Sequence, residues 1–152
     1  MHRFEIRVRY GDTDQMGWVY YGNYLRWFEI GRAEMMRSLG RSYREVEDGL
    51  GVLMPVLEAH CRYFHGARYD ERVTLETGLL DHDRASMRFG YRVRGEDGAV
   101  CAIGWTSHCF TTREAKLVRP PAMLRDLLGV APVVDAELRA QLGEPAGGGV
   151  SS

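Results

Sequence analysis

Residues 9–29, "RYGDTDQMGWVYYGNYLRWFE", join a loop that carries two aspartates to a segment rich in aromatic residues. Before the loop, apolar and charged side chains alternate over residues 4–10, which predicts a strand with one buried face. After the loop, apolar side chains recur every three or four positions over residues 21–39, which predicts a long helix. A glycine inside this apolar stripe, Gly31, costs about 1 kcal/mol relative to alanine, so it indicates a close contact between the helix and its neighbour.

The rest of the chain is predicted to form strands and short helices. Four segments have strand-like composition, and a glycine-bounded turn joins the last two as a hairpin: residues 52–64, 71–80, 84–95 and 99–112. Short helices are predicted at residues 42–49, 119–129 and 135–143. The last residues, 144–152, offer almost no apolar surface and are expected to be disordered. A strand and a long helix followed by four strands indicate an α+β fold with one antiparallel sheet on one helix.

Composition restricts the possible partners. The chain has 152 residues and a net charge of -1, so no basic surface for nucleic acid is expected, and no apolar run is long enough for a membrane span. Its three cysteines, Cys61, Cys101 and Cys109, lack C-x-x-C spacing, and its first residues are polar. These features favour a reduced, cytoplasmic protein whose partner is a small molecule or another protein. His60, His65 and His108 have no ligand-like spacing, so no metal is expected.

Residues 10–29 follow the pattern Y-x-D-T-D-x-x-G-x-V-Y-Y-x-N-Y-L-x-W-F-E. This pattern resembles the opening motif of the hotdog-fold acyl-CoA thioesterases of the 4-hydroxybenzoyl-CoA thioesterase type. Residues 55–77, "PVLEAHCRYFHGARYDERVTLET", resemble the second and third strands of that family. The resemblance implies a curved antiparallel sheet wrapped around one long helix, in a hotdog domain over residues 1–130. Residues 131–152 would then be a C-terminal extension.

The resemblance also implies roles for individual residues. Asp14 takes the position of the catalytic carboxylate, and the backbone N–H of Tyr21 takes that of the group that polarises the thioester carbonyl. An acid and helix-start N–H donors suit this chemistry, because thioester attack needs a nucleophile or general base and a site for the oxyanion. Gly17 would let the loop bend close to the substrate. The implied substrate-binding residues are Gly17, Val19, Tyr20, Tyr24, Arg84, Lys116 and Arg119.

Several alternatives remain open at this stage. Asp12 is interpreted as structural, since an aspartate in a loop commonly closes an Asx-turn. Asp14 could act as nucleophile or as general base. In the branch of the family associated with the Tol-Pal system, the position of Tyr21 is commonly histidine, so the acyl group is left undetermined. The arginines Arg84, Arg88, Arg92 and Arg94, at even positions of one predicted strand, could bind the phosphates of coenzyme A or form a solvated face.

Three other functions compete with hydrolysis of acyl-CoA. They are an Asp-x-Asp phosphatase, which needs alternating strands and helices, a hotdog dehydratase, which needs an early histidine, and a non-catalytic acyl-CoA-binding domain. No cofactor is expected beyond the coenzyme A of the substrate. A homodimer or homotetramer with sites between subunits is expected, because a single sheet has open edges and a strand face with Ile103 and Trp105 that needs cover.

Overall fold

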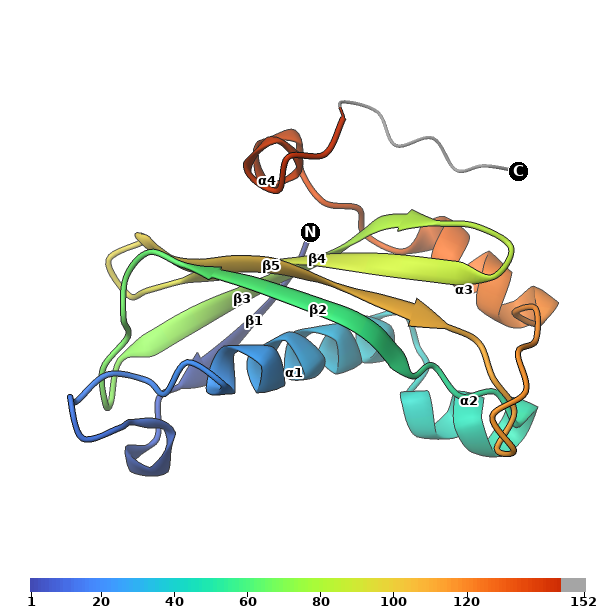
Figure 1. Ribbon diagram of the computed structural model, residues 1–152, viewed down its shortest axis with the longest axis horizontal. Helices are drawn as coiled ribbons and strands as arrows, with labels where there is room; N and C mark the ends of the chain where they lie inside the picture. Colours follow the sequence, from blue (N-terminus) through green and yellow to red (C-terminus); the bar gives the residue numbers. More distant parts are fainter. Residues whose placement is uncertain (146–152) are drawn as a thin grey trace.

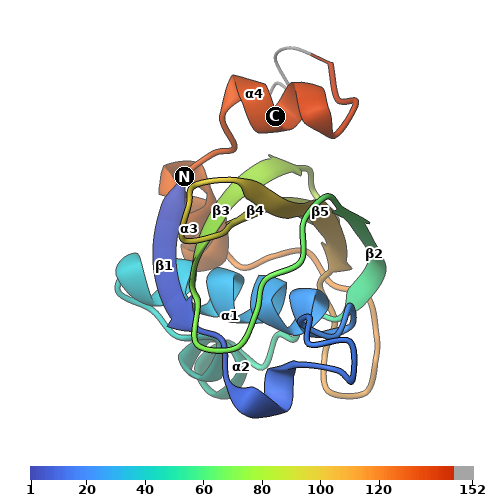
Figure 2. The same ribbon diagram turned by 90° about the vertical axis from the view of Figure 1, so that its left-hand side faces the viewer.

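The computed structural model describes residues 1–145, and its five strands form one antiparallel sheet in the order β1-β3-β4-β5-β2. The sheet curves around the long helix α1, which lies along its concave face (Figure 1, Figure 2). The elements are β1 (His2–Arg7), α1 (Asn23–Ser38), α2 (Tyr43–Leu50), β2 (Val56–Tyr63), β3 (Arg72–His82), β4 (Ser86–Arg94), β5 (Val100–Cys109), α3 (Ala122–Val130) and α4 (Ala136–Gln141). This arrangement confirms the predicted α+β architecture and hotdog fold. It also excludes the Asp-x-Asp phosphatase alternative, because every strand pairing within the sheet is antiparallel.

Two predicted boundaries at the start of the chain are wrong. The first strand ends at Arg7, and Tyr10, predicted on its buried face, is 80% exposed in a short 3₁₀ turn over Tyr10–Asp12. The long helix begins at Asn23, so Tyr21 precedes its first turn. Periodicity did not reveal where the strand ends or where the helix begins, because hydrogen bonds of the two aspartates shape the loop between strand and helix.

Helix α1 packs against the sheet through the predicted apolar stripe. Tyr24, Phe28, Gly31 and Met35 are buried on that side of the helix. A Cβ atom added at Gly31 would lie 2.4 Å from the Oγ1 atom of Thr77 on β3. The glycine therefore allows the close approach between helix and sheet that the sequence predicted. None of the helices in residues 1–145 is both long and apolar enough to cross a membrane.

We expect Gly31→Ala to lower the free energy of unfolding by about 1–3 kcal/mol, because the new methyl group overpacks the buried, β-branched Thr77. The matched control is Gly49→Ala in α2, where an added Cβ would meet nothing within 4 Å. There the substitution should raise stability by about 0.5–1 kcal/mol through helix propensity. Urea unfolding measures both values, and two changes of the same sign would contradict the close-approach explanation.

The outer face of the sheet is covered by residues 131–145 of the same chain. Val134 lies over Gly78 and Gly90, where an added Cβ atom would be 2.6 Å from the Val134 N atom and 2.7 Å from its Cγ1 atom, respectively. Leu79 donates its N–H to the Pro132 carbonyl (2.7 Å) and accepts the N–H of Val134 (3.0 Å). The helix α4 seen above the sheet in Figure 2 adds Leu138, which is fully buried against the sheet.

This cover corrects the expectation that Ile103 needs a partner subunit to bury it. Ile103 is 1% exposed and packs in one cluster with Leu80, Val134 and Leu138. Trp105 packs at the edge of the same cluster and is half-buried. An argument for oligomers must therefore rest on other surfaces.

The arginines of β4 are neither a solvated face nor a free phosphate site. Arg92 is 3% exposed and pairs with Glu76 of β3 (2.5 Å) and with Asp135 at the start of α4 (2.6 Å). Further ion pairs link Arg92 to Glu137, Arg88 to Asp81 and Glu144, and Arg94 to Glu76 and Glu137. Glu144 is thus docked, which corrects the expectation that it begins a contact-free tail. The rest of that tail, 146–152, lies outside the described residues.

Candidate active site

Asp12 holds the loop between β1 and α1 in place. Its Oδ2 atom accepts the backbone N–H of Arg9 at 2.8 Å. Its carbonyl oxygen accepts the N–H of Tyr20 and the side-chain amide of Asn23, each at 2.8 Å. These contacts tie the beginning of the loop to the beginning of the helix, so Asp12 has a structural role, although its side chain bonds residue 9 and does not close the expected Asx-turn.

Asp14 lies at the turn of the same loop, with one carboxylate oxygen anchored and the other available. Its Oδ1 atom accepts the N–H groups of Met16 (2.9 Å) and Trp18 (3.4 Å). Its own N–H donates to the Trp18 carbonyl at 2.8 Å, and Gly17 completes the turn with a φ of 77°, which favours glycine. Within residues 1–145 no donor is found for Oδ2. The carboxylate is therefore oriented by the backbone while one oxygen can reach a ligand.

A cavity of about 250 Å³ lies beside Asp14. Its wall is mainly aromatic and includes three of the predicted site residues besides Asp14: Val19, Tyr21 and Tyr24. The other lining residues are Met16, Trp18, Tyr63, Phe64, His65 and Gly66. Burial raises the pKa of Tyr24 to about 12, so its phenol stays neutral near pH 7. The cavity offers an apolar space for a small group next to a fixed carboxylate.

Tyr21 lines this cavity, and its backbone N–H is available to donate a hydrogen bond. Tyr63, at the end of β2, donates its hydroxyl hydrogen to the Tyr21 carbonyl oxygen at 3.0 Å. In the described part of the chain no acceptor is found for the Tyr21 N–H. The N–H groups that begin a helix favour negative charge, and α1 begins two residues later, at Asn23. Tyr63 is a site residue that the sequence analysis missed, since strand periodicity gives no sign of a contact 42 positions away.

The other predicted site residues lie elsewhere. Tyr20 is half-exposed and lines a different, open cavity of about 680 Å³ that also touches Asp14. Arg84 follows β3, which leads away from the loop, and Lys116 and Arg119 follow β5 at the same far end of the sheet (Figure 1). Eleven strand residues at about 3.3 Å each separate the two ends by roughly 35 Å. One chain alone does not bring these three cations to Asp14, so their role stays a prediction.

Two arginines that the sequence analysis did not select lie closer to the cavity. The Arg68 guanidinium is 3.7 Å from the ring centre of Trp18, and that of Arg62 is 5.1 Å from the ring centre of Phe64. Both aromatic rings line the cavity beside Asp14. No group of three or more His, Cys, Asp or Glu side chains that could hold a metal ion occurs in the part of the chain that the structure describes.

Comparison with known proteins relates the chain to thioesterases. YneP of Bacillus subtilis (strain 168), provisionally named an acyl-CoA thioesterase, is 35% identical over 111 residues, which cover 73% of this chain and 80% of YneP. The 1,4-dihydroxy-2-naphthoyl-CoA hydrolase of Thermosynechococcus vestitus is 29% identical over 132 residues, 85% of this chain and 89% of that protein. The crystal structure of the hypothetical protein TT1821 from Thermus thermophilus has a TM-score of 0.80 at 32% identity, covering 85% of this chain and 98% of that one.

The sequence profile of the thioesterase-like superfamily matches residues 8–138. This range includes the loop with Asp14, helix α1 and all of the sheet except β1. The chain therefore belongs to the thioesterase-like superfamily.

Proposed function

We propose that the protein hydrolyses acyl-CoA thioesters to a free acid and coenzyme A, with Asp14 as the reacting carboxylate. The observation that carries the proposal is the placement of Asp14, whose Oδ1 atom is held by two N–H groups while Oδ2 is available at an aromatic cavity. The relatives named as an acyl-CoA thioesterase and an aromatic acyl-CoA hydrolase support the same substrate class.

In the proposed reaction the acyl group enters the cavity lined by Tyr24 and Tyr63. The thioester oxygen accepts a hydrogen bond from the Tyr21 N–H, and the helix start behind it stabilises the negative charge of the tetrahedral intermediate. Asp14 either attacks the carbonyl carbon and forms an anhydride that water opens, or removes a proton from the attacking water. By either route the carbon–sulfur bond breaks, the thiolate of coenzyme A leaves and takes up a proton, and the acid remains.

The proposed reaction uses no metal, and it uses no cofactor beyond the coenzyme A that arrives as part of the substrate. Both aliphatic and aromatic acyl groups fit the chemistry of an aromatic wall. We also propose a cytoplasmic location, because free cysteines stay reduced there and acyl-CoA substrates occur there.

The proposed active form is a homodimer or homotetramer. β2 is an edge strand of the sheet. Three of its apolar side chains and that of the next residue are exposed: Val56, Leu57, Tyr63 and Phe64. Exposed apolar edge strands pair with other strands, so a second copy is the expected partner. A neighbouring subunit could also supply Arg84, Lys116 and Arg119 to the site of its partner. A monomer by light scattering at micromolar concentration would contradict this assembly.

The test is a thiol-release assay over a panel of acyl-CoA substrates with short, long and aromatic acyl groups. We expect turnover of at least one class at rates typical of enzymes, about 1–1000 per second. Tight binding of the panel without thiol release would instead identify a non-catalytic acyl-CoA-binding domain.

A further inference from the structure

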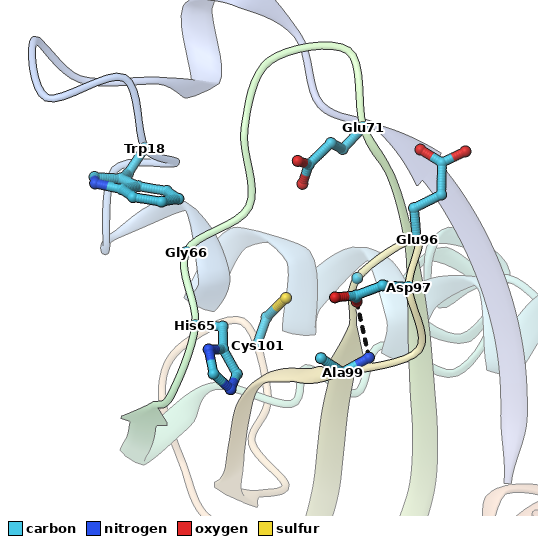
Figure 3. A pocket seen from close by; sticks show the side chains of 9 residues that line it. Trp18, His65, Gly66, Glu71, Glu96, Asp97, Ala99 and Cys101 are labelled. Carbon is cyan, nitrogen blue, oxygen red and sulfur yellow. Dashed lines mark hydrogen bonds between the residues drawn. The ribbon is translucent and has the colours of Figure 1, made fainter.

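A second cavity, of about 550 Å³, lies next to the one beside Asp14 and is more than twice as large. Both cavities are bordered by Trp18, His65 and Gly66. Figure 3 shows the Trp18 ring on one side of the backbone at Gly66, and Cys101 and Asp97 on the other. The two spaces thus share a boundary, to which the Gly66 backbone and the Trp18 indole ring contribute together with His65.

The Trp18 ring is held in this position from both directions. A Cβ atom added at Gly66 would lie 2.6 Å from the Cε3 atom of Trp18, so the ring occupies the space of the missing side chain. The guanidinium of Arg68 lies 3.7 Å from the ring centre. The N–H of Val19 donates to the Ala67 carbonyl at 2.9 Å and fixes the two segments together. The ring therefore has a defined place as a wall between the cavities.

The second cavity differs from the first in its charge. Three carboxylates line it, those of Glu71, Glu96 and Asp97. Of these, only Glu96 has an ion-pair partner in residues 1–145, the exposed Arg72 at 3.3 Å. Burial raises the pKa of Cys101 to about 11, with Asp97 and Glu71 contributing, so its thiol stays neutral. An acyl chain that entered this space would be disfavoured if it ended in a negative charge.

Resting on the proposed function, we propose that Trp18 is a specificity-determining residue that ends the acyl pocket. The pocket beside Asp14 holds about eight water volumes, which suits a compact acyl group. With the indole in place, a longer chain meets the ring. Without it, the space above the Gly66 backbone opens and joins the pocket to the second cavity.

The test compares kcat/KM along a series of saturated acyl-CoA substrates, from butanoyl to hexadecanoyl, in wild type, Trp18→Ala and Trp18→Phe. We expect Trp18→Ala to raise the ratio of long-chain to short-chain kcat/KM by at least about tenfold, as a changed hydrophobic pocket does. The ratio for Trp18→Phe should lie between the ratios for wild type and Trp18→Ala. The control is Tyr69→Ala, an exposed aromatic residue of the same segment that lines neither cavity, and it should keep the wild-type profile.

A second comparison tests whether the long chain enters the acidic cavity. The kcat/KM of Trp18→Ala for the neutral hexadecanoyl-CoA should exceed that of wild type. For an acyl-CoA of equal chain length that ends in a carboxylate, kcat/KM should rise less than about threefold. The assignment would be overturned if Trp18→Ala kept the wild-type dependence of kcat/KM on chain length, or lost kcat/KM equally for all chain lengths. It would also be overturned if kcat/KM rose equally for both end groups. Failure of the proposed function looks different, since wild type itself would then release no thiol from any substrate.

Discussion

Asp14→Asn is expected to lower turnover of a good acyl-CoA substrate by at least about 100-fold, the usual loss when a positioned base is removed. The side-chain oxygen of asparagine can still accept the N–H groups of Met16 and Trp18, so the turn should persist. The substitution changes the other oxygen, Oδ2, which has no donor within residues 1–145 and is replaced by an uncharged NH₂ group. Substrate binding and the melting temperature should stay near the wild-type values, by thiol release, calorimetry and circular dichroism.

Asp12→Asn is the matched control in the same loop. The Asp12 side chain accepts one N–H, that of Arg9, and an asparagine oxygen can do the same. Its other contacts to Tyr20 and Asn23 use the carbonyl oxygen of the backbone, which the substitution leaves intact. Turnover should therefore stay within about tenfold of wild type. An active Asp14→Asn protein would refute the proposed mechanism, and an inactive Asp12→Asn protein beside it would transfer the role to Asp12.

The largest expected effect on stability is that of Glu76→Ala. The Glu76 side chain is 2% exposed, and the guanidinium groups of Arg3, Arg92 and Arg94 all lie within 3.2 Å of it. Removal of the carboxylate takes the one buried partner from Arg92, which keeps only the more exposed Asp135 and Glu137, so we expect a loss of about 3 kcal/mol. This is a large part of the roughly 5–15 kcal/mol typical of a domain. Urea unfolding measures the loss, with Asp48→Ala as the control.

Asp48 is suited to this comparison because it also pairs with two arginines, Arg44 and Arg113, but is 60% exposed. Its removal should cost less than about 1 kcal/mol. Burial raises the pKa of Glu76, but hydrogen bonds from Arg92 and Arg94 lower it more, so the net shift is downward. Stability from a lowered carboxylate pKa is present above the unfolded value and is lost as pH falls through the folded one. The difference in free energy of unfolding between wild type and Glu76→Ala should accordingly become smaller in acid. A difference that grows in acid would contradict the ion-pair explanation.

The elements of the fold could be predicted because their causes are local. Alternation over residues 4–10 and helical spacing over residues 21–39 reflect which face of each element is buried, and Gly31 marked the helix contact before Thr77 was known to be its partner. Element ends were less accurate, since the 3₁₀ turn at Tyr10 depends on the side chain of Asp12.

Contacts between distant parts of the chain could not be predicted in the same way. The pairing of Arg92 with Asp135 joins residues 43 positions apart, and local spacing showed only that Arg92 lay on a polar strand face. The core also holds a chain of polar side chains whose hydrogen bonds local spacing did not predict. In it Arg32 donates to the Tyr91 hydroxyl (3.1 Å), which bonds Thr106 (2.7 Å), and Thr106 bonds His108 (2.8 Å).

For the site, the loop motif and its resemblance led to Asp14, whereas Tyr63 and Arg68 came only from the structure. Their contacts reach back to Tyr21 and Trp18 across more than 40 positions. The resemblance named three cations instead, which in one chain lie at the end of the sheet far from Asp14. Residue types and spacing thus led to the proposed reacting group, but not to the groups that surround it.

The covering of the sheet by residues 131–145 has a consequence for how the protein is made. The ribosome releases a chain from its N-terminus, so all five strands emerge before the segment that closes their outer face. Until that segment arrives, Leu80 and Ile103 face water on a nearly complete sheet. A chain truncated before residue 131 would therefore keep its five strands but expose this apolar face, and we expect such a chain to aggregate.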